Sequence, residues 1–145
     1  MSTSHSLSLP FNVKSWDEKT LHQLDPAPDA KITQAAVVYS VTPAADSQLT
    51  APNMAVDYVM SNPEAGDAAT AHFVGFVRLD AQWEGKEAAL VLREMGTYTK
   101  AAGTSSELVV VEGSGRGPWA GAKGRGTAKA GHSGGMMELT LELAA

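Results

Sequence analysis

The chain has 145 residues, of which 43% are hydrophobic and 19% are charged, a size and composition typical of one globular domain. Its formal net charge of −5 argues against nucleic-acid binding, which needs an excess of cationic side chains to displace counterions from phosphates. Cysteine is absent, which excludes a disulfide framework, a thiol nucleophile and a thiolate metal site.

The amino-terminal segment, residues 1–9, is rich in serine and is expected to be a loose tail. It lacks the basic cluster and apolar run of a signal peptide, and no later segment approaches the roughly 20 apolar residues of a membrane span. The sequence therefore predicts a cytoplasmic protein without a membrane partner, with a single domain over residues 10–145.

Eight segments have the composition and periodicity of β-strands. In the first and third, apolar and polar residues alternate with the period of two that is typical of a half-buried strand. Gly75 in the middle of the fourth indicates a bend or bulge. In the fifth, the apolar run 88–92 leaves a helix as the alternative, although the β-branched and aromatic end of the segment favours a strand. The predicted strands are 11–16, 31–42, 54–60, 69–79, 87–99, 106–112, 124–130 and 136–143.

A glycine-rich segment, residues 113–126, lies between the sixth and seventh predicted strands and holds six of the 14 glycines of the chain. This density predicts backbone at positive φ or in close approach to other atoms, where a Cβ would clash. We interpret the segment as a tight corner followed by a bent hairpin.

Eight consecutive short strands without a long helix predict an all-β fold, an eight-stranded antiparallel β-barrel, because closure removes the exposed strand edges. A β-sandwich is the alternative. A barrel of eight strands is either filled by side chains or holds one small ligand. Segments 73–77, 88–92 and 108–111 are apolar on both faces. A covered outer face is therefore expected, and we predict a homo-oligomer.

Two glycine motifs and the histidines give no cofactor or metal site. Residues 115–120 match G-x-G-x-x-G/A, but Pro118 and Gly121 oppose the helix that would bind a pyrophosphate. Residues 131–135 match G-x-S-x-G, but no histidine follows Ser133 to complete a triad. No spacing typical of metal ligands joins the four histidines, which are His5, His22, His72 and His132. We therefore expect no cofactor and no metal.

Glu94 is the candidate catalytic residue. It shares the parity of Leu90 and Leu92, the face of its strand that we expect to turn inward. Burial in an apolar lumen would raise the pKa of its carboxyl group, unless a cation such as Arg78 pairs with it. Such a group suits a general acid or base, or a hydrogen-bond anchor for a ligand. The opposite parity is also partly apolar, so an outward-facing Glu94 stays an alternative.

Tyr58, Glu94, Tyr98 and Arg78 are the predicted ligand-binding residues. The two tyrosines share the inward parity of their strands with other apolar residues and would line the same cavity as Glu94. The alternative for both is ordinary core packing, with the hydroxyl reaching a polar partner.

Short motifs spread over about residues 10–143 resemble the bacterial domain-of-unknown-function family 3224. That family is assigned to the allene oxide cyclase barrel class, which includes plant dirigent proteins. The resemblance therefore implies an oligomeric eight-stranded antiparallel barrel with a lumen, but no reaction. The matching motifs are Phe11-x-Val13-x-Ser15-Trp16-Asp17-Glu18, Phe73-Val74-Gly75, Gly96-Thr97-Tyr98, Gly113-Ser114-Gly115-x-Gly117 and Leu139-x-Leu141.

Three functions follow as hypotheses. The first is a binding module that holds a small apolar or amphipathic molecule in the barrel lumen. The second, by analogy with the cyclase and dirigent proteins, is an isomerase or cyclase that acts on a hydrophobic substrate, with Glu94 or Glu112 assisting proton movement. The third is a structural, oligomerising protein with a filled lumen.

Overall fold

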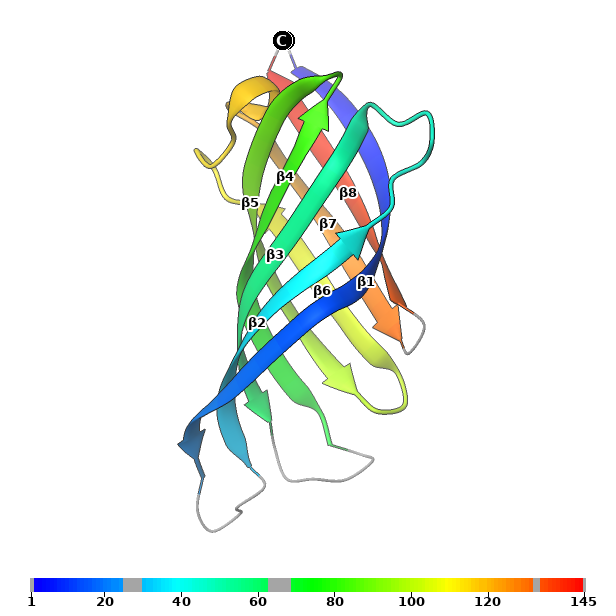
Figure 1. Ribbon diagram of the computed structural model, residues 1–145. Coiled ribbons are helices and arrows are strands. Elements are labelled where there is room, and N and C mark those ends of the chain that lie inside the picture. The colour runs from blue at the N-terminus through cyan, green and yellow to red at the C-terminus, as the bar shows by residue number, and fades with distance from the viewer. Residues whose placement is uncertain (1, 25–29, 63–68, 132–133, 145) are drawn as a thin grey trace.

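The computed structural model describes residues 2–24, 30–62, 69–131 and 134–144, which form one closed antiparallel barrel in the strand order β1 to β8 (Figure 1). Each strand pairs with its neighbours in the sequence, and β1 pairs with β8 to close the ring. The predicted all-β class and its eight antiparallel strands are confirmed, including a strand where a helix was the alternative. The elements are β1 Ser2–Gln23, β2 Lys31–Val41, β3 Leu49–Asn62, β4 Ala71–Trp83, β5 Lys86–Thr99, β6 Gly103–Val110, the 3₁₀ turn η1 Gly117–Trp119, β7 Lys123–Gly131 and β8 Gly134–Ala144.

The amino-terminal segment is part of β1 from Ser2 onward, so the expectation of a loose tail over residues 1–9 is wrong there. Its pairing with β8 runs from Ser2 opposite Ala144 to Phe11 opposite Gly135. Leu7 and Leu9 are buried in the barrel core. Ser6 and Ser8 alternate with them and are exposed, so the segment has the period of two of a strand despite its polar composition.

β1 has two partners in succession, and this opens one end of the barrel. Up to Phe11 it pairs with β8, Phe11 itself also pairs with Val41 of β2, and from Asn12 to Gln23 β1 pairs with β2 alone. The register of the second part shifts between Val13 and Ser15. β1 and β2 therefore extend together beyond the first residue of β8, as Figure 1 shows at the lower left.

The opposite end of the barrel, where β1 begins and β8 ends, is filled by large side chains. Trp119 of η1 is fully buried, and its ring lies 6.0 Å from that of Trp83. Leucines from β3, β4, β5 and β8 pack beside them; they are Leu49, Leu79, Leu90 and Leu141. Any space for a ligand inside the barrel is therefore expected at the open end.

β6 pairs only with the second half of β5, from Leu92 to Thr99. Along the first half of β5, the glycine-rich segment lies where a neighbouring strand would otherwise pair. Arg116 forms an isolated antiparallel bridge with Ala89, and Ser114 bonds the backbone of Val91. Gly117 has a φ of 63°, and a Cβ there would meet the carbonyl oxygen of Glu87. The predicted tight corner is confirmed.

Part of the outer face of the barrel is apolar. Val59 on β3, Val74 on β4 and Met95 on β5 lie opposite one another in one row across the sheet. Phe76 lies beside this row, and all four side chains are exposed. We call these four residues the outer apolar patch. The patch agrees with the sequence pattern, and the homo-oligomer stays a prediction. Within the described residues, no helix has the length and hydropathy needed to cross a lipid bilayer.

Candidate functional site

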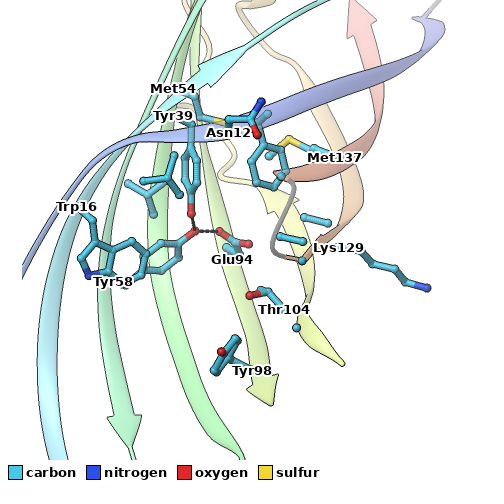
Figure 2. Close-up of a pocket in the computed structure, with 18 of the residues that line it drawn as sticks. Asn12, Trp16, Tyr39, Met54, Tyr58, Glu94, Tyr98, Thr104, Lys129 and Met137 are labelled. Carbon is cyan, nitrogen blue, oxygen red and sulfur yellow. Dashed lines mark hydrogen bonds between the residues drawn. The ribbon is translucent and has the colours of Figure 1, made fainter. Parts of the chain in front are cut away.

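A pocket of about 280 Å³ opens into the barrel beside the β1–β2 hairpin. A second hollow of about 360 Å³ shares Trp16, Tyr39, Tyr58, Tyr98 and Thr104 with it, and we call the region around these shared residues the mouth. All eight strands and the β5–β6 loop contribute residues to the lining of the pocket. Its lining includes Asn12, Trp16, Tyr39, Met54, Tyr58, Glu94, Tyr98, Thr104, Lys129 and Met137 (Figure 2).

Glu94 lies inside the barrel, with 4% of its surface exposed. The Tyr58 hydroxyl donates a hydrogen bond of 2.7 Å to Oε1, and the Ser106 hydroxyl donates one of 2.6 Å to Oε2. Among the residues that the structure describes, Glu94 forms an ion pair with none. The inward parity of Glu94 on β5 is as expected, and its role as a binding or catalytic residue stays a prediction.

Tyr39 extends this contact into a chain of hydrogen bonds. Its hydroxyl oxygen lies 3.1 Å from that of Tyr58. A phenol has one proton, and Tyr58 gives its proton to Glu94, so Tyr39 is the donor of the second bond. The chain Tyr39–Tyr58–Glu94 thus runs from the wall of the pocket to the buried carboxyl group, as Figure 2 shows.

Two glycines make room for this cluster. Tyr58 on β3, Gly75 on β4 and Glu94 on β5 lie in one row across the sheet. A Cβ on Gly75 would lie 2.7 Å from the Tyr58 ring, so the missing side chain lets the phenol reach across β4. Gly96 makes room for Ser106 in the same way, because a Cβ added to Gly96 would lie 2.5 Å from the Cβ of Ser106. The register passes through Gly75 without a shift, so the predicted bulge there is wrong.

The electrostatics of the cluster follow from burial. Burial raises the pKa of Glu94 above its ordinary value, and the hydrogen bonds from Ser106 and Tyr58 act against this rise. Burial and the nearby charge of Glu94 raise the pKa of Tyr58 far above the ordinary phenol value. Burial likewise raises the pKa of Tyr39. Both phenols therefore stay neutral hydrogen-bond donors.

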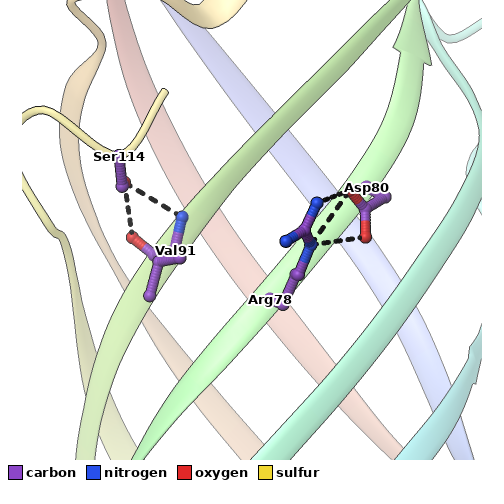
Figure 3. Close-up of polar contacts among 4 residues, drawn as sticks. All are labelled: Arg78, Asp80, Val91 and Ser114. Atoms are coloured by element: carbon purple, nitrogen blue, oxygen red, sulfur yellow. Dashed lines mark hydrogen bonds and ion pairs between the residues drawn. The ribbon is translucent and has the colours of Figure 1, made fainter. Parts of the chain in front are cut away.

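Arg78 is not part of the site. Its side chain points outward, is 66% exposed and forms an ion pair of 3.0 Å with Asp80 (Figure 3). Strict alternation along β4 places Val77 and Leu79 in the core and Arg78 between them outside. The prediction that Arg78 pairs with Glu94 or faces a lumen ligand is wrong.

The other predicted residues lie at different places. Tyr98 stands at the mouth, with 42% of its surface exposed, and lines both hollows. Glu112 lies outside the barrel, where its side chain is 77% exposed and 4.0 Å from Lys123, so it cannot move a proton in the lumen. The G-x-S-x-G motif includes Ser133, which lies outside the described residues.

Sequence reasoning missed Tyr39 and Ser106. Tyr39 follows Ala35 and Val37 on the inward parity of its strand, and Ser106 precedes Leu108 on the inward parity of β6. That parity was the available signal. Which inward residues meet across the barrel depends on the register of the strands from β2 to β6, and the sequence does not give it.

The fold and the site define a closed eight-stranded antiparallel β-barrel with one filled end and one open end that contains a buried carboxyl group. Over residues 8–143 the sequence matches the family described as protein of unknown function (DUF3224), and the chain belongs to that family. The wider assignment to the allene oxide cyclase class stays a prediction.

A solved structure shares this fold. It is a protein of unknown function from the DUF3224 family of Shewanella oneidensis MR-1, with 14% sequence identity and a TM-score of 0.75. The match covers 99% of this chain and 100% of the other. A search among curated proteins gives no match.

Proposed function

We propose that this protein binds one small molecule, with an apolar body and a polar group, in the open end of its barrel. The observation that carries the proposal is Glu94, a buried carboxyl group on the wall of a pocket lined mostly by apolar and aromatic side chains. Ligand pockets have this composition, with a few convergent polar groups in an apolar wall.

The cost of burying these polar groups supports a functional role. Burying a carboxyl group and two phenols costs desolvation free energy that their hydrogen bonds must offset, whereas apolar side chains carry no such cost. The opposite end of the same barrel is filled by leucine and tryptophan. The polar cluster and the pocket therefore coincide at the end where packing is incomplete, which favours ligand binding over a structural protein with a filled lumen.

The experiment has two parts. Native mass spectrometry of the purified protein looks for a retained small molecule. Ligand-observed NMR then measures binding of naphthalenemethanol, whose ring system suits the aromatic wall and whose hydroxyl can reach Tyr39 or Glu94. A positive result in either part supports the proposal, and the absence of both overturns it.

A matched pair of variants locates the site. Ala130 lines the pocket, so Ala130→Leu fills it, whereas Ala55→Leu adds the same atoms on the exposed outer face of β3. We expect Ala130→Leu to weaken probe binding about tenfold or more and Ala55→Leu to leave it unchanged. Equal binding by both variants would show that the probe binds elsewhere.

A second candidate is an enzyme of isomerase or cyclase type that acts on a hydrophobic substrate. The chain Tyr39–Tyr58–Glu94 favours it, since linked hydroxyl and carboxyl groups can pass a proton between a ligand and the protein interior. Glu94→Gln would then abolish turnover, whereas a pure binding protein has no turnover to lose.

A further inference from the structure

Resting on the proposed function, we infer that the pocket selects a cationic ligand. The ligand class is a protonated amine on an apolar or aromatic body, and its ammonium group bonds the carboxylate of Glu94. The proposed function requires only that a ligand binds, whereas this inference assigns a positive charge to the polar group of the ligand and names Glu94 as the residue that binds it.

The first argument is the missing counter-charge. Glu94 receives hydrogen bonds from two neutral hydroxyls, those of Tyr58 and Ser106, and no side chain of the described residues supplies it with a positive charge. Without a partner charge, burial holds a carboxyl group toward its neutral form, and a cation bound beside it favours the carboxylate. The hydrogen bonds are present and the cation is not, so a ligand that brings one completes the site.

The second argument is the free acceptor capacity of the carboxylate. An ionised carboxyl group has about four lone-pair positions, and the two hydroxyls occupy one on each oxygen. An ammonium group is a donor only and has three N–H bonds. It can therefore add to Glu94 without displacing Tyr58 or Ser106.

The third argument is the aromatic wall. The rings of Trp16 and Tyr58 stack with their centroids 6.5 Å apart, and those of Phe11 and Tyr39 meet edge to face at 5.0 Å. All four residues line the pocket. Aromatic faces attract cations, above all when the cation is partly desolvated. A wall of rings around one carboxylate thus favours an amine over a neutral alcohol.

The charged groups at the mouth do not reverse this preference. Lys100 and Lys129 line the pocket, and Figure 2 shows the Lys129 side chain directed away from Glu94. On the other side of the mouth, Glu18 accepts a hydrogen bond of 2.9 Å from the Trp16 indole. An anionic ligand would meet the lysines at the rim but would be repelled by Glu94 inside.

Three probes of one shape and different charge test the inference on the full chain at neutral pH: naphthylmethylamine, naphthalenemethanol and naphthoate. Isothermal titration calorimetry measures their affinities. We expect the amine to bind about tenfold tighter than the alcohol or better, and the naphthoate weakest. An amine that binds no better than the alcohol overturns the inference and leaves the proposed function standing. If none of the three binds, the inference fails, and the proposed function fails with it when native mass spectrometry also shows no retained molecule.

Glu94→Gln identifies the residue that reads the charge. It should lower the affinity of the amine to that of the alcohol measured on the same variant. Glu107→Gln is the control, since it removes the same charge from the exposed outer face of β6. An amine preference that survives in Glu94→Gln, or is lost equally in both variants, overturns the assignment. The comparison of the three probes on the unaltered protein decides the inference even if Glu94→Gln does not fold.

Discussion

The Tyr58 hydroxyl bonds the Glu94 carboxyl group at 2.7 Å although the two residues lie on β3 and β5, which do not pair with each other. The phenol crosses the intervening strand β4 above Gly75. A polar contact inside the barrel thus depends on the absence of a side chain on a third strand, and this relationship gives the first prediction.

Gly75→Ala should destabilise the protein and disturb the pocket. The added Cβ would lie 2.7 Å from the Tyr58 ring and 2.5 Å from the carbonyl oxygen of Asp57, and the backbone atom cannot move aside. Overpacking of this kind costs about 1–3 kcal/mol. Urea denaturation followed by far-ultraviolet circular dichroism measures the free energy of unfolding.

Gly131→Ala is the control for this substitution. A Cβ there meets no atom within 4 Å, so we expect a change in the free energy of unfolding within about 0.5 kcal/mol. Equal free energies of unfolding for Gly75→Ala and Gly131→Ala would contradict the prediction. They would mean that the backbone of β4 shifts to accept the added Cβ, although β4 is paired continuously on both sides of Gly75.

Tyr58→Phe should raise the pKa of Glu94 further. The substitution removes a donor that favours the charged carboxylate and leaves the burial of Glu94 in place. Loss of a hydrogen bond to a buried charged group also costs about 1.5–3 kcal/mol at a pH where Glu94 is ionised. NMR titration of the Glu94 side-chain carboxyl carbon measures the pKa.

Tyr98→Phe is the matched control, because this phenol stands at the mouth and has no hydrogen bond to Glu94 among the described contacts. It should leave the Glu94 pKa unchanged. A Glu94 pKa that falls in Tyr58→Phe, or shifts equally in both variants, would contradict the donor role of Tyr58.

The stability of the protein should fall as Glu94 ionises. Because burial raises its folded-state pKa above the unfolded value, the folded state holds the proton more tightly. The stabilisation from Glu94 is therefore complete below the ordinary glutamate pKa of 4.5 and is lost as the pH rises through the folded-state pKa. Thermal unfolding recorded from below pH 4.5 to above the folded-state pKa of Glu94 measures this decline in stability.

Glu94→Gln should remove this part of the pH dependence, since an amide does not titrate. Glu107→Gln, at the exposed outer position, should retain it. An unchanged pH profile in Glu94→Gln would mean that another group causes the decline.

The sequence was sufficient to predict eight strands and the side of β5 that faces the core, because alternation of apolar and polar residues is a local property. It failed at residues 1–9 because composition was weighed above the alternation that places Leu7 and Leu9 inside. It failed at Arg78 because parity was applied to β5 and not to β4, where Val77 fixes the inward face.

The candidate site was less accessible, since it depends on contacts between strands. Glu94 was found from parity and burial. Its partners were not, because Tyr39 and Ser106 meet the cluster only through the stagger of the closed barrel. Gly75 was interpreted as a bend or bulge, although its significance lies in the neighbouring phenol, and no local pattern contains that information.

The outer apolar patch tests the predicted homo-oligomer. Phe76 and Met95 are 56% and 58% exposed, an arrangement that favours burial against a second copy of the chain. We expect the protein to sediment as an oligomer in analytical ultracentrifugation and the double variant Phe76→Ser, Met95→Ser to sediment as a monomer. Thr140→Ala, on the outer face of β8, should keep the oligomer.

Far-ultraviolet circular dichroism tests whether the double variant keeps its strands, because an unfolded chain would also lose the oligomer. A monomeric unaltered protein would contradict the prediction and leave the patch exposed to solvent.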